Sequence, residues 1–393
     1  LTNLAKESCV AWHNRLAVAL ESAGAGAVDP EALLIHWQEA GQLERAAGYA
    51  SRAADQAAAT LAFARAASLY KQALELHSYS GAARCVLLAK LGSALTNANR
   101  GAEAAPVFLL AAADAGQKES CDLQRRAADE FLISGHLEEG LRVLAQVLAA
   151  VGLKLGSNTA QVLASLYWRR ARLKLRGLQF TPRSAQQIPT EQLLRIDVCW
   201  AVARGLGMVD PIRTADFQTL HLLLALEAGE PYRVTRALAL ELAYRSSEGG
   251  PSQREVNQLA AAAQELAGQV NDPHITGLVA LFTGMAHFLR GDWRRALELQ
   301  QQAQSVLLER CTGVAWEWAL AHRFALGSLM YLGELRELQQ RVAAVLADAR
   351  ETGNLYTATD VRLRYNLAWL AADDPRGAKR ALDEGLADWS SHG

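Results

Sequence analysis

Two aspartates that flank an arginine are the first candidates for chemistry in this sequence. Asp210 and Asp216 lie six residues apart, with Arg213 between them. Paired carboxylates can act as a general acid and a general base when their environments separate their pKa values. Asp210, however, directly precedes Pro211, and an aspartate N-cap followed by proline is a common helix start. The sequence therefore favours a helix cap with a surface ion pair over an acid–base site.

The motifs of the common enzyme classes are missing from the sequence. It contains no Gly-x-x-x-x-Gly-Lys-Ser/Thr phosphate loop, no glycine-rich kinase loop, and neither a His-Arg-Asp nor an Asp-Phe-Gly motif. No His-Glu-x-x-His occurs and the nine histidines are scattered, so we expect no metal site. We predict that the chain is not an enzyme, has no catalytic residues and uses no cofactor.

Arginines and tryptophans are the better functional candidates, because they often anchor binding surfaces. Trp293, Trp316, Trp318 and Trp369 all fall in the last third of the chain. Packing between helices explains such residues, and the alternative is a concave surface that binds a peptide or a small ligand. For that surface we predict a ligand- or partner-binding set of Arg213, Arg233, Trp293, Trp316 and Arg323.

A basic helix is predicted over residues 158–176. Arg169, Arg172 and Arg176 recur at intervals of three and four residues, so they share one helix face. We favour a solvated or salt-bridged face, while docking against an acidic domain and phosphate or nucleic-acid binding stay open. Nucleic acid is the less favoured partner, since 40 basic residues balance 41 acidic ones over the whole chain.

The composition indicates a helical globular protein. Of the 393 residues, 51% are hydrophobic and 21% are charged, and alanine and leucine dominate the hydrophobic set. The longest apolar runs, such as residues 220–226, are far shorter than a membrane span. The five cysteines include no Cys-x-x-Cys pair, which is typical of free thiols in a reducing cytosol. We therefore expect an all-α, cytoplasmic protein that does not associate with a membrane.

A pattern of small and large residues occurs twice between residues 88 and 147. Counted from Gly92 and from Ala128, the marks recur at +3, +12, +16 and +19. They are Leu95, Ala104, Phe108 and Ala111 in the first copy, and Phe131, Gly140, Leu144 and Val147 in the second. This pattern resembles the tetratricopeptide repeat, in which small residues let two helices approach and large ones fill the space beside them. We predict a tetratricopeptide-like right-handed α-solenoid of about nine or ten helix pairs.

Asp-Pro pairs punctuate the predicted helices. They occur at residues 29–30, 210–211, 272–273 and 374–375, where we expect helices to begin. Pro106 predicts a kink or a late helix start, residues 177–190 a loop, and residues 354–371 a single helix. We divide the chain into N-terminal helical repeats (1–155), an irregular helical middle section (156–250) and C-terminal tetratricopeptide-like repeats (251–393).

Several longer phrases resemble one known family. They are Asp197-Val-Cys-Trp200, Val-Asp-Pro-Ile-Arg (209–213), Gly-Glu-Pro-Tyr-Arg (229–233) and Arg-Cys-Thr-Gly-Val-Ala-Trp-Glu (310–317). Together they are similar to the C-terminal region of large bacterial multidomain serine/threonine protein kinases. In that family a kinase domain precedes a signal-transduction ATPase module of the AAA-like class and tetratricopeptide-type helices. The segment Trp12-His-Asn-Arg-Leu-Ala17 resembles the end of such an ATPase module.

The resemblance implies a helical array that senses a ligand or partner and controls the attached kinase and ATPase modules. No residue of this chain matches the kinase or nucleotide-binding residues of that family. The implied partners are a protein or peptide segment, the upstream modules of the same protein, or a small ligand. Alternatives are the sensor array of a transcription activator and a nucleic-acid-binding α-solenoid. Because the chain starts at Leu1 rather than Met and shows no polar capping helix after residue 390, we expect the natural protein to be longer.

Overall fold

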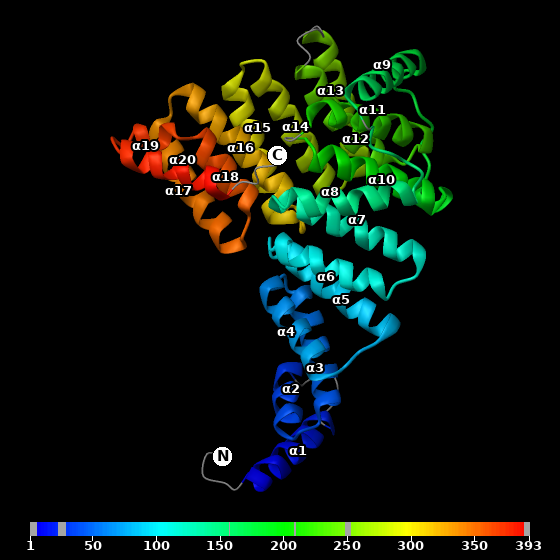
Figure 1. Ribbon diagram of the computed structural model, residues 1–393, viewed down its shortest axis with the longest axis vertical. Helices are drawn as coiled ribbons and strands as arrows, with labels where there is room; N and C mark the ends of the chain where they lie inside the picture. The colour runs from blue at the N-terminus through cyan, green and yellow to red at the C-terminus, as the bar shows by residue number, and fades with distance from the viewer. Residues whose placement is uncertain (1–5, 23–28, 157, 208–209, 248–252, 389–393) are drawn as a thin grey trace. The chain divides into compact units, whose positions relative to one another are not determined.

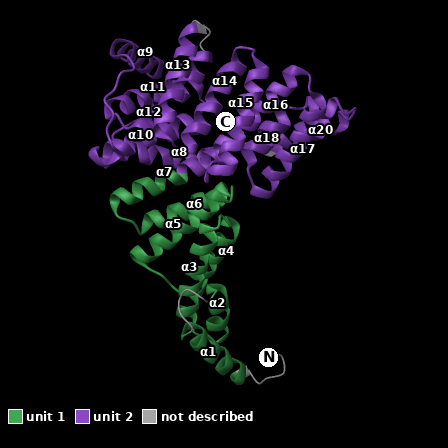
Figure 2. Cartoon of the chain, turned by 180° about the vertical axis from the view of Figure 1, so that it is seen from behind, with its two compact units in different colours: residues 1–127 green, residues 128–393 purple. Residues whose placement is uncertain are grey.

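The computed structural model is all-α in the residues that it describes, which are 6–22, 29–156, 158–207, 210–247 and 253–388. Within these ranges twenty α-helices and one short 3-10 helix follow one another, without a strand (Figure 1). The all-α prediction is confirmed. The chain divides into two compact units, residues 1–127 (unit 1) and residues 128–393 (unit 2) (Figure 2). This division falls inside helix α7 (Gln117–Ser134), whereas the sequence pattern changes near residues 155 and 250.

Unit 1 is a solenoid-like stack in which each helix packs against the next. Its helices are α1 (Lys6–Ser22), α2 (Pro30–Glu39), α3 (Leu43–Ala59), α4 (Phe63–Leu76), α5 (Gly81–Asn97), α6 (Gly101–Ala113) and the first part of α7. Helix α4 contacts both α3 and α5, so one helix serves two neighbours. Alanine is the commonest buried residue, for example Ala46, Ala50, Ala66 and Ala73, and these small side chains allow neighbouring helices to lie close together.

The repeat marks of the sequence lie at helix contacts. In the first copy Leu95, Ala104, Phe108 and Ala111 are all buried. A Cβ atom at Gly92 would lie 2.5 Å from the Phe108 ring, so only glycine lets this ring sit against the helix backbone. The second copy is buried in the same way, and Arg100 and Gly135 lie in the turns between the helices of each copy. The interpretation of small residues as points of close approach is confirmed.

Unit 2 departs from strict neighbour-to-neighbour packing. Its helices are the end of α7, α8 (Leu137–Ala150), α9 (Thr159–Arg176), η1 (Ala185–Gln187), α10 (Thr190–Gly205), α11 (Pro211–Ala228), α12 (Pro231–Ser247), α13 (Gln253–Val270), α14 (Pro273–Leu289), α15 (Trp293–Arg310), α16 (Ala315–Leu332), α17 (Leu335–Thr352), α18 (Leu355–Arg364), α19 (Leu367–Leu370) and α20 (Pro375–Asp388). Helix α9 packs against α11, and α12 packs against α14 as well as α13. The order in which helices pack therefore changes in the part of the chain where the repeat pattern is less regular.

The four Asp-Pro pairs begin helices as predicted. The aspartate side chains accept hydrogen bonds from backbone N–H groups, pairing Asp29 with Glu31, Asp210 with Arg213, Asp272 with Ile275 and Asp374 with Gly377. Such bonds satisfy donors that the first helical turn leaves open. The predicted cap role of Asp210 is confirmed.

Three predictions about helices were wrong or incomplete. Helix α13 lies within the predicted C-terminal repeats, but the sequence analysis gave it no bounds. The single helix expected over residues 354–371 is broken into α18 and α19. At the break the Tyr365 hydroxyl donates to the carbonyl of Arg323 and the Asn366 amide donates to the carbonyl of Ala378. The late start at Pro106 is also wrong. Helix α6 begins at Gly101 and continues through the proline, which gives up one backbone donor.

The predicted loop after α9 packs onto the turn between α11 and α12. The backbone N–H of Arg183 donates to the carbonyl of Gly229 at 2.8 Å. Gly229 has a φ of +77°, and a Cβ atom there would lie 2.1 Å from the carbonyl oxygen of Thr181. Glycine is required at this turn both for its left-handed backbone and for the space that the loop occupies.

Candidate functional site

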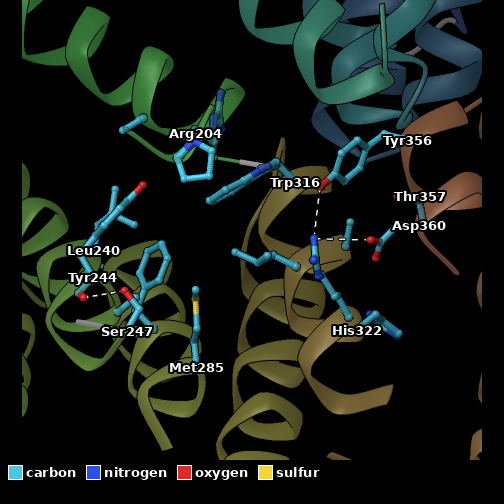
Figure 3. Close-up of a pocket in the computed structure, with 18 of the residues that line it drawn as sticks. Arg204, Leu240, Tyr244, Ser247, Met285, Trp316, His322, Tyr356, Thr357 and Asp360 are labelled. Atoms are coloured by element: carbon cyan, nitrogen blue, oxygen red, sulfur yellow. Dashed lines mark hydrogen bonds and ion pairs between the residues drawn. The ribbon is translucent and has the colours of Figure 1, made fainter. Parts of the chain in front are cut away.

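A cavity within unit 2 is the feature best suited to binding. Its volume is about 240 Å³, and its walls come mainly from α10, α12, α14, α16 and α18. Figure 3 shows side chains of these helices converging on the cavity. Cavities between helices that are lined by apolar groups and a few polar ones are common sites for small molecules.

Apolar and aromatic side chains form most of the wall. Leu240 and Tyr244 project from α12, Met285 from α14 and Trp316 from α16 (Figure 3). Trp316 is fixed by an edge-to-face contact with Trp200, with ring centroids 5.9 Å apart and an interplanar angle of 81°. This wall can remove an apolar ligand from water and hold it against rigid aromatic rings.

A compensated ion pair forms one polar part of the wall. Nη1 of Arg323 lies 3.3 Å from the Tyr356 hydroxyl and 3.5 Å from Oδ1 of Asp360. Asp360 also accepts a hydrogen bond of 2.6 Å from Nε of Arg364. Burial raises the pKa of Tyr356 to about 12, although the charge of Arg323 opposes the shift. The phenol is therefore neutral near pH 7, and the positive charge of Arg323 has a nearby carboxylate.

Arg204 connects the cavity with a buried charge network. Its guanidinium lies 2.9 Å from Asp129 and 3.5 Å from Glu317. Nε2 of His274 lies 3.3 Å from Glu317, and the Tyr232 hydroxyl lies 2.7 Å from Nδ1 of His274. Burial by itself would raise the pKa of Glu317, but the His274 hydrogen bond and the Arg204 charge outweigh it, and the pKa is lowered. The network thus holds ionised Glu317 in the interior beside the cavity.

His322 adds a neutral polar group to the wall. Its Nδ1–H donates to the carbonyl oxygen of Trp318 at 2.9 Å. Burial lowers the pKa of His322 to about 4; the bond to Trp318 opposes this shift, and the charge of Arg341 adds to it. The imidazole is consequently uncharged near pH 7 and contributes no positive charge to the cavity.

The cavity contains two of the five residues predicted to bind a ligand or partner. Trp316 and Arg323 both line it. Trp293 does not, since it stacks on Tyr331 with ring centroids 4.8 Å apart and an interplanar angle of 16°. Its role in this structure is to pack the start of α15.

Arg213 and Arg233 make contacts within the fold rather than lining the cavity. Arg213 donates to the carbonyl of Gly156 at 3.0 and 3.1 Å and pairs with Asp210. Arg233 makes a two-pronged contact with Asp197 at 3.0 and 2.6 Å. Both arginines tie segments distant in sequence to the starts of α11 and α12.

The basic face of α9 is engaged by acceptors of α11. Arg169 lies 2.8 Å from the Asp216 carboxylate, Arg172 pairs with Glu227, and Arg176 donates to the carbonyl of Leu226 at 2.9 Å. Burial raises the pKa of Asp216, with the charge of Arg169 opposing the rise. The two carboxylates Asp210 and Asp216 thus bind different arginines. Asp210 caps α11, and Asp216 pairs α11 with α9.

Sequence reasoning missed much of the cavity. Arg204, Tyr244, Tyr356 and Asp360 line it, and no motif or spacing links them. The one local signal is the four-residue interval between Asp360 and Arg364, which indicates only an ion pair on a helix. These side chains come together because α10, α12 and α18 surround the same space.

Among the described residues no group of His, Cys, Asp and Glu side chains has an arrangement that could hold a metal ion. In the same residues, none of the helices has the length and apolar character needed to cross a membrane. No model of a known protein family matches the chain, and a search of curated proteins finds no significant match.

Proposed function

We propose that this chain is a non-catalytic sensor region of a bacterial signalling protein, and that unit 2 binds a small molecule in its cavity. The cavity carries the proposal, because it joins apolar walls to a small number of fixed polar groups. The resemblance of several phrases to the kinase-associated helical region supports the signalling role. In this proposal the region works in the cytoplasm and its ligand controls attached kinase and ATPase modules.

The shape of the cavity favours a small molecule over a peptide segment. Its lining comes from helices as far apart in sequence as α10 and α18, and these surround a volume of about 240 Å³. A peptide held in an extended groove would instead contact a series of neighbouring repeats on one face. Binding here would report on the mutual positions of α12, α16 and α18, which gives the ligand a way to bias their packing.

A cavity-filling variant tests the proposal. Ala319 lines the cavity from α16, so Ala319→Trp should occupy it. Native mass spectrometry of the purified chain, before and after incubation with a metabolite extract, should detect a bound small molecule that this variant loses. Ala261→Trp, on the exposed face of α13, is the matched control and should retain the ligand.

Two results would contradict the proposal. One is a small molecule that stays bound to Ala319→Trp with unchanged affinity, which would place binding elsewhere. The other is ATP hydrolysis or phosphate transfer by the isolated chain, which would make it an enzyme. Circular dichroism of both tryptophan variants establishes that the helices remain folded.

A further inference from the structure

The body of the cavity has the chemistry of an aromatic-binding site. Tyr244, Phe282, Trp316 and Tyr356 contribute four aromatic rings, and Met285 adds a polarisable sulfur. Aromatic rings and thioethers pack favourably against a further ring. A ligand that fills about 240 Å³ would displace on the order of ten water molecules from a mainly apolar wall. Displacement of water that has few polar partners favours an apolar ligand.

The charges around the cavity balance one another. Arg204 faces Asp129 at 2.9 Å and Glu317 at 3.5 Å. On the other side Asp360 lies between two guanidinium groups, 3.5 Å from Arg323 and 2.6 Å from Arg364. Three carboxylates thus accompany three guanidinium groups, and His322 is neutral. An anionic or cationic ligand would place an extra buried charge in this balanced set, which costs free energy.

The Arg323 side of the wall offers both a donor and an acceptor. The separation of 3.5 Å between Nη1 of Arg323 and Oδ1 of Asp360 exceeds the usual length of a hydrogen bond, so the contact is mainly electrostatic. Thr357, next to Tyr356, is 8% exposed, and its hydroxyl has no hydrogen-bond partner among the described residues. A polar group that can donate and accept would match this side of the cavity.

We propose that the cavity binds a neutral, mainly aromatic small molecule whose one polar end meets the Thr357 hydroxyl beside Arg323 and Asp360. This inference rests on the proposed sensor function and specifies the ligand of that site. The two parts of the wall then have different roles. The aromatic side chains supply affinity, and the balanced ion pairs disfavour charged analogues.

Three probes of the same ring system test the ligand class. They are 2-naphthol, which is neutral with a polar end, naphthalene, which lacks that end, and 2-naphthoate, which is anionic at pH 7. Equilibrium dialysis against the 393-residue chain gives the three dissociation constants. We expect naphthol to bind about threefold to tenfold more tightly than naphthalene, as one added hydrogen bond predicts. Naphthoate should bind at least about tenfold more weakly than naphthol.

Asp360→Asn tests the charge argument directly. The variant removes the carboxylate between Arg323 and Arg364 and enlarges the positive excess there, so the preference for naphthol over naphthoate should shrink or reverse. Ala319→Trp should abolish binding of naphthol, and Ala261→Trp should leave it unchanged. Glu265→Gln, at an exposed position of α13, is a charge-matched control that should not alter the preference.

The outcomes separate this inference from the proposed function. Two results would show that the ligand is not a neutral molecule. Naphthoate would bind the unaltered chain as tightly as naphthol, or Asp360→Asn would leave the ratio of the naphthol and naphthoate dissociation constants unchanged. If no probe binds while a co-purified molecule is still lost from Ala319→Trp, the ligand class is wrong and the sensor cavity stands. If all three probes bind equally to Ala319→Trp, they occupy another site and the inference fails.

Discussion

Unit 1 and unit 2 are built from the same kind of helix but bury different side chains. Among the described residues every buried polar or charged side chain belongs to unit 2, including Asp129, Glu241 and Glu317. The ion pairs of unit 1 lie nearer the surface, and in one of them the side chain of Arg65 is 56% exposed. Unit 1 therefore depends on apolar packing, whereas unit 2 combines packing with buried charge.

The difference indicates where the chain is specialised. Buried ion pairs contribute little net stability compared with apolar packing of the same volume, because both charges lose their water. A helical stack can be built without them, as unit 1 shows. Some of these pairs hold α9 against α11 and α12, through Asp216 and Glu241. Those of Arg204 and Arg323 lie beside the cavity, where they are consistent with a role in recognition.

Removal of Arg204 should have the largest effect on stability. Arg204→Leu leaves Asp129 and Glu317 buried without this cation, and loss of one partner from a buried pair costs about 3–5 kcal/mol. Arg65→Leu in unit 1 removes a pair with Glu31 near the surface and should cost about 1 kcal/mol or less. Urea titration measures both, and hydrogen exchange on peptides from each unit assigns the loss.

Equal losses for the two arginine variants would remove the basis for the comparison. Such a result would mean that solvent reaches the Arg204 network, or that the packing of the Arg65 side chain contributes more to stability than its charge does. A loss confined to unit 2 peptides in Arg204→Leu would support the distinction.

Acidification should destabilise unit 2 through His322. Burial lowers the pKa of this imidazole from 6.5 to about 4, so between these values the unfolded chain binds the proton more readily than the folded one. The stability that neutral His322 provides is complete above about pH 6.5 and is lost as the pH falls towards 4, by about 1.4 kcal/mol per pH unit and about 3 kcal/mol in all. His322→Gln should flatten this part of the pH profile.

Unit 1 provides the comparison for the pH profile. Burial and the neighbouring His13 also lower the pKa of His36, so its contribution has the same sign. We expect His36→Gln to change the profile less than His322→Gln, because His36 lies in a less buried position. A larger change from His36→Gln would show that buried histidine is not a feature specific to unit 2.

The sequence was most informative about features that depend on neighbouring residues. The Asp-Pro pairs fixed helix starts because a cap and its N–H donors lie within one turn. The marks around Gly92 and Phe108 identified helix contacts because both helices of a pair are adjacent in sequence. The break at Tyr365 was not predictable in this way, because its hydroxyl bonds the carbonyl of Arg323 on another helix.

The cavity shows the same limit for the functional site. Trp316 and Arg323 were singled out by residue type, and type alone could not separate them from Trp293 and Arg233. What distinguishes them is the space left between α12, α16 and α18. That space depends on helix positions across more than one hundred residues of sequence, which no local spacing records.

The smallest predicted difference concerns one turn in each unit. Gly41 in unit 1 and Gly229 in unit 2 have φ values of +73° and +77°, so alanine at either turn costs about 1–2 kcal/mol for the backbone alone. A Cβ atom at Gly41 would meet nothing within 4 Å, whereas at Gly229 it would lie 2.1 Å from the Thr181 carbonyl oxygen. Gly229→Ala should therefore lose about 1–2 kcal/mol more than Gly41→Ala in urea titrations.

The additional loss of stability in Gly229→Ala should be accompanied by faster hydrogen exchange near the substituted turn. Because the loop of residues 177–189 must move away from the new methyl group, the bond from Arg183 N–H to the Gly229 carbonyl should weaken and exchange faster with deuterium. Equal losses for the two alanine variants, with unchanged exchange at Arg183, would mean that the loop yields without cost. In that case the irregular packing of unit 2 would be no more constrained than a simple turn of unit 1.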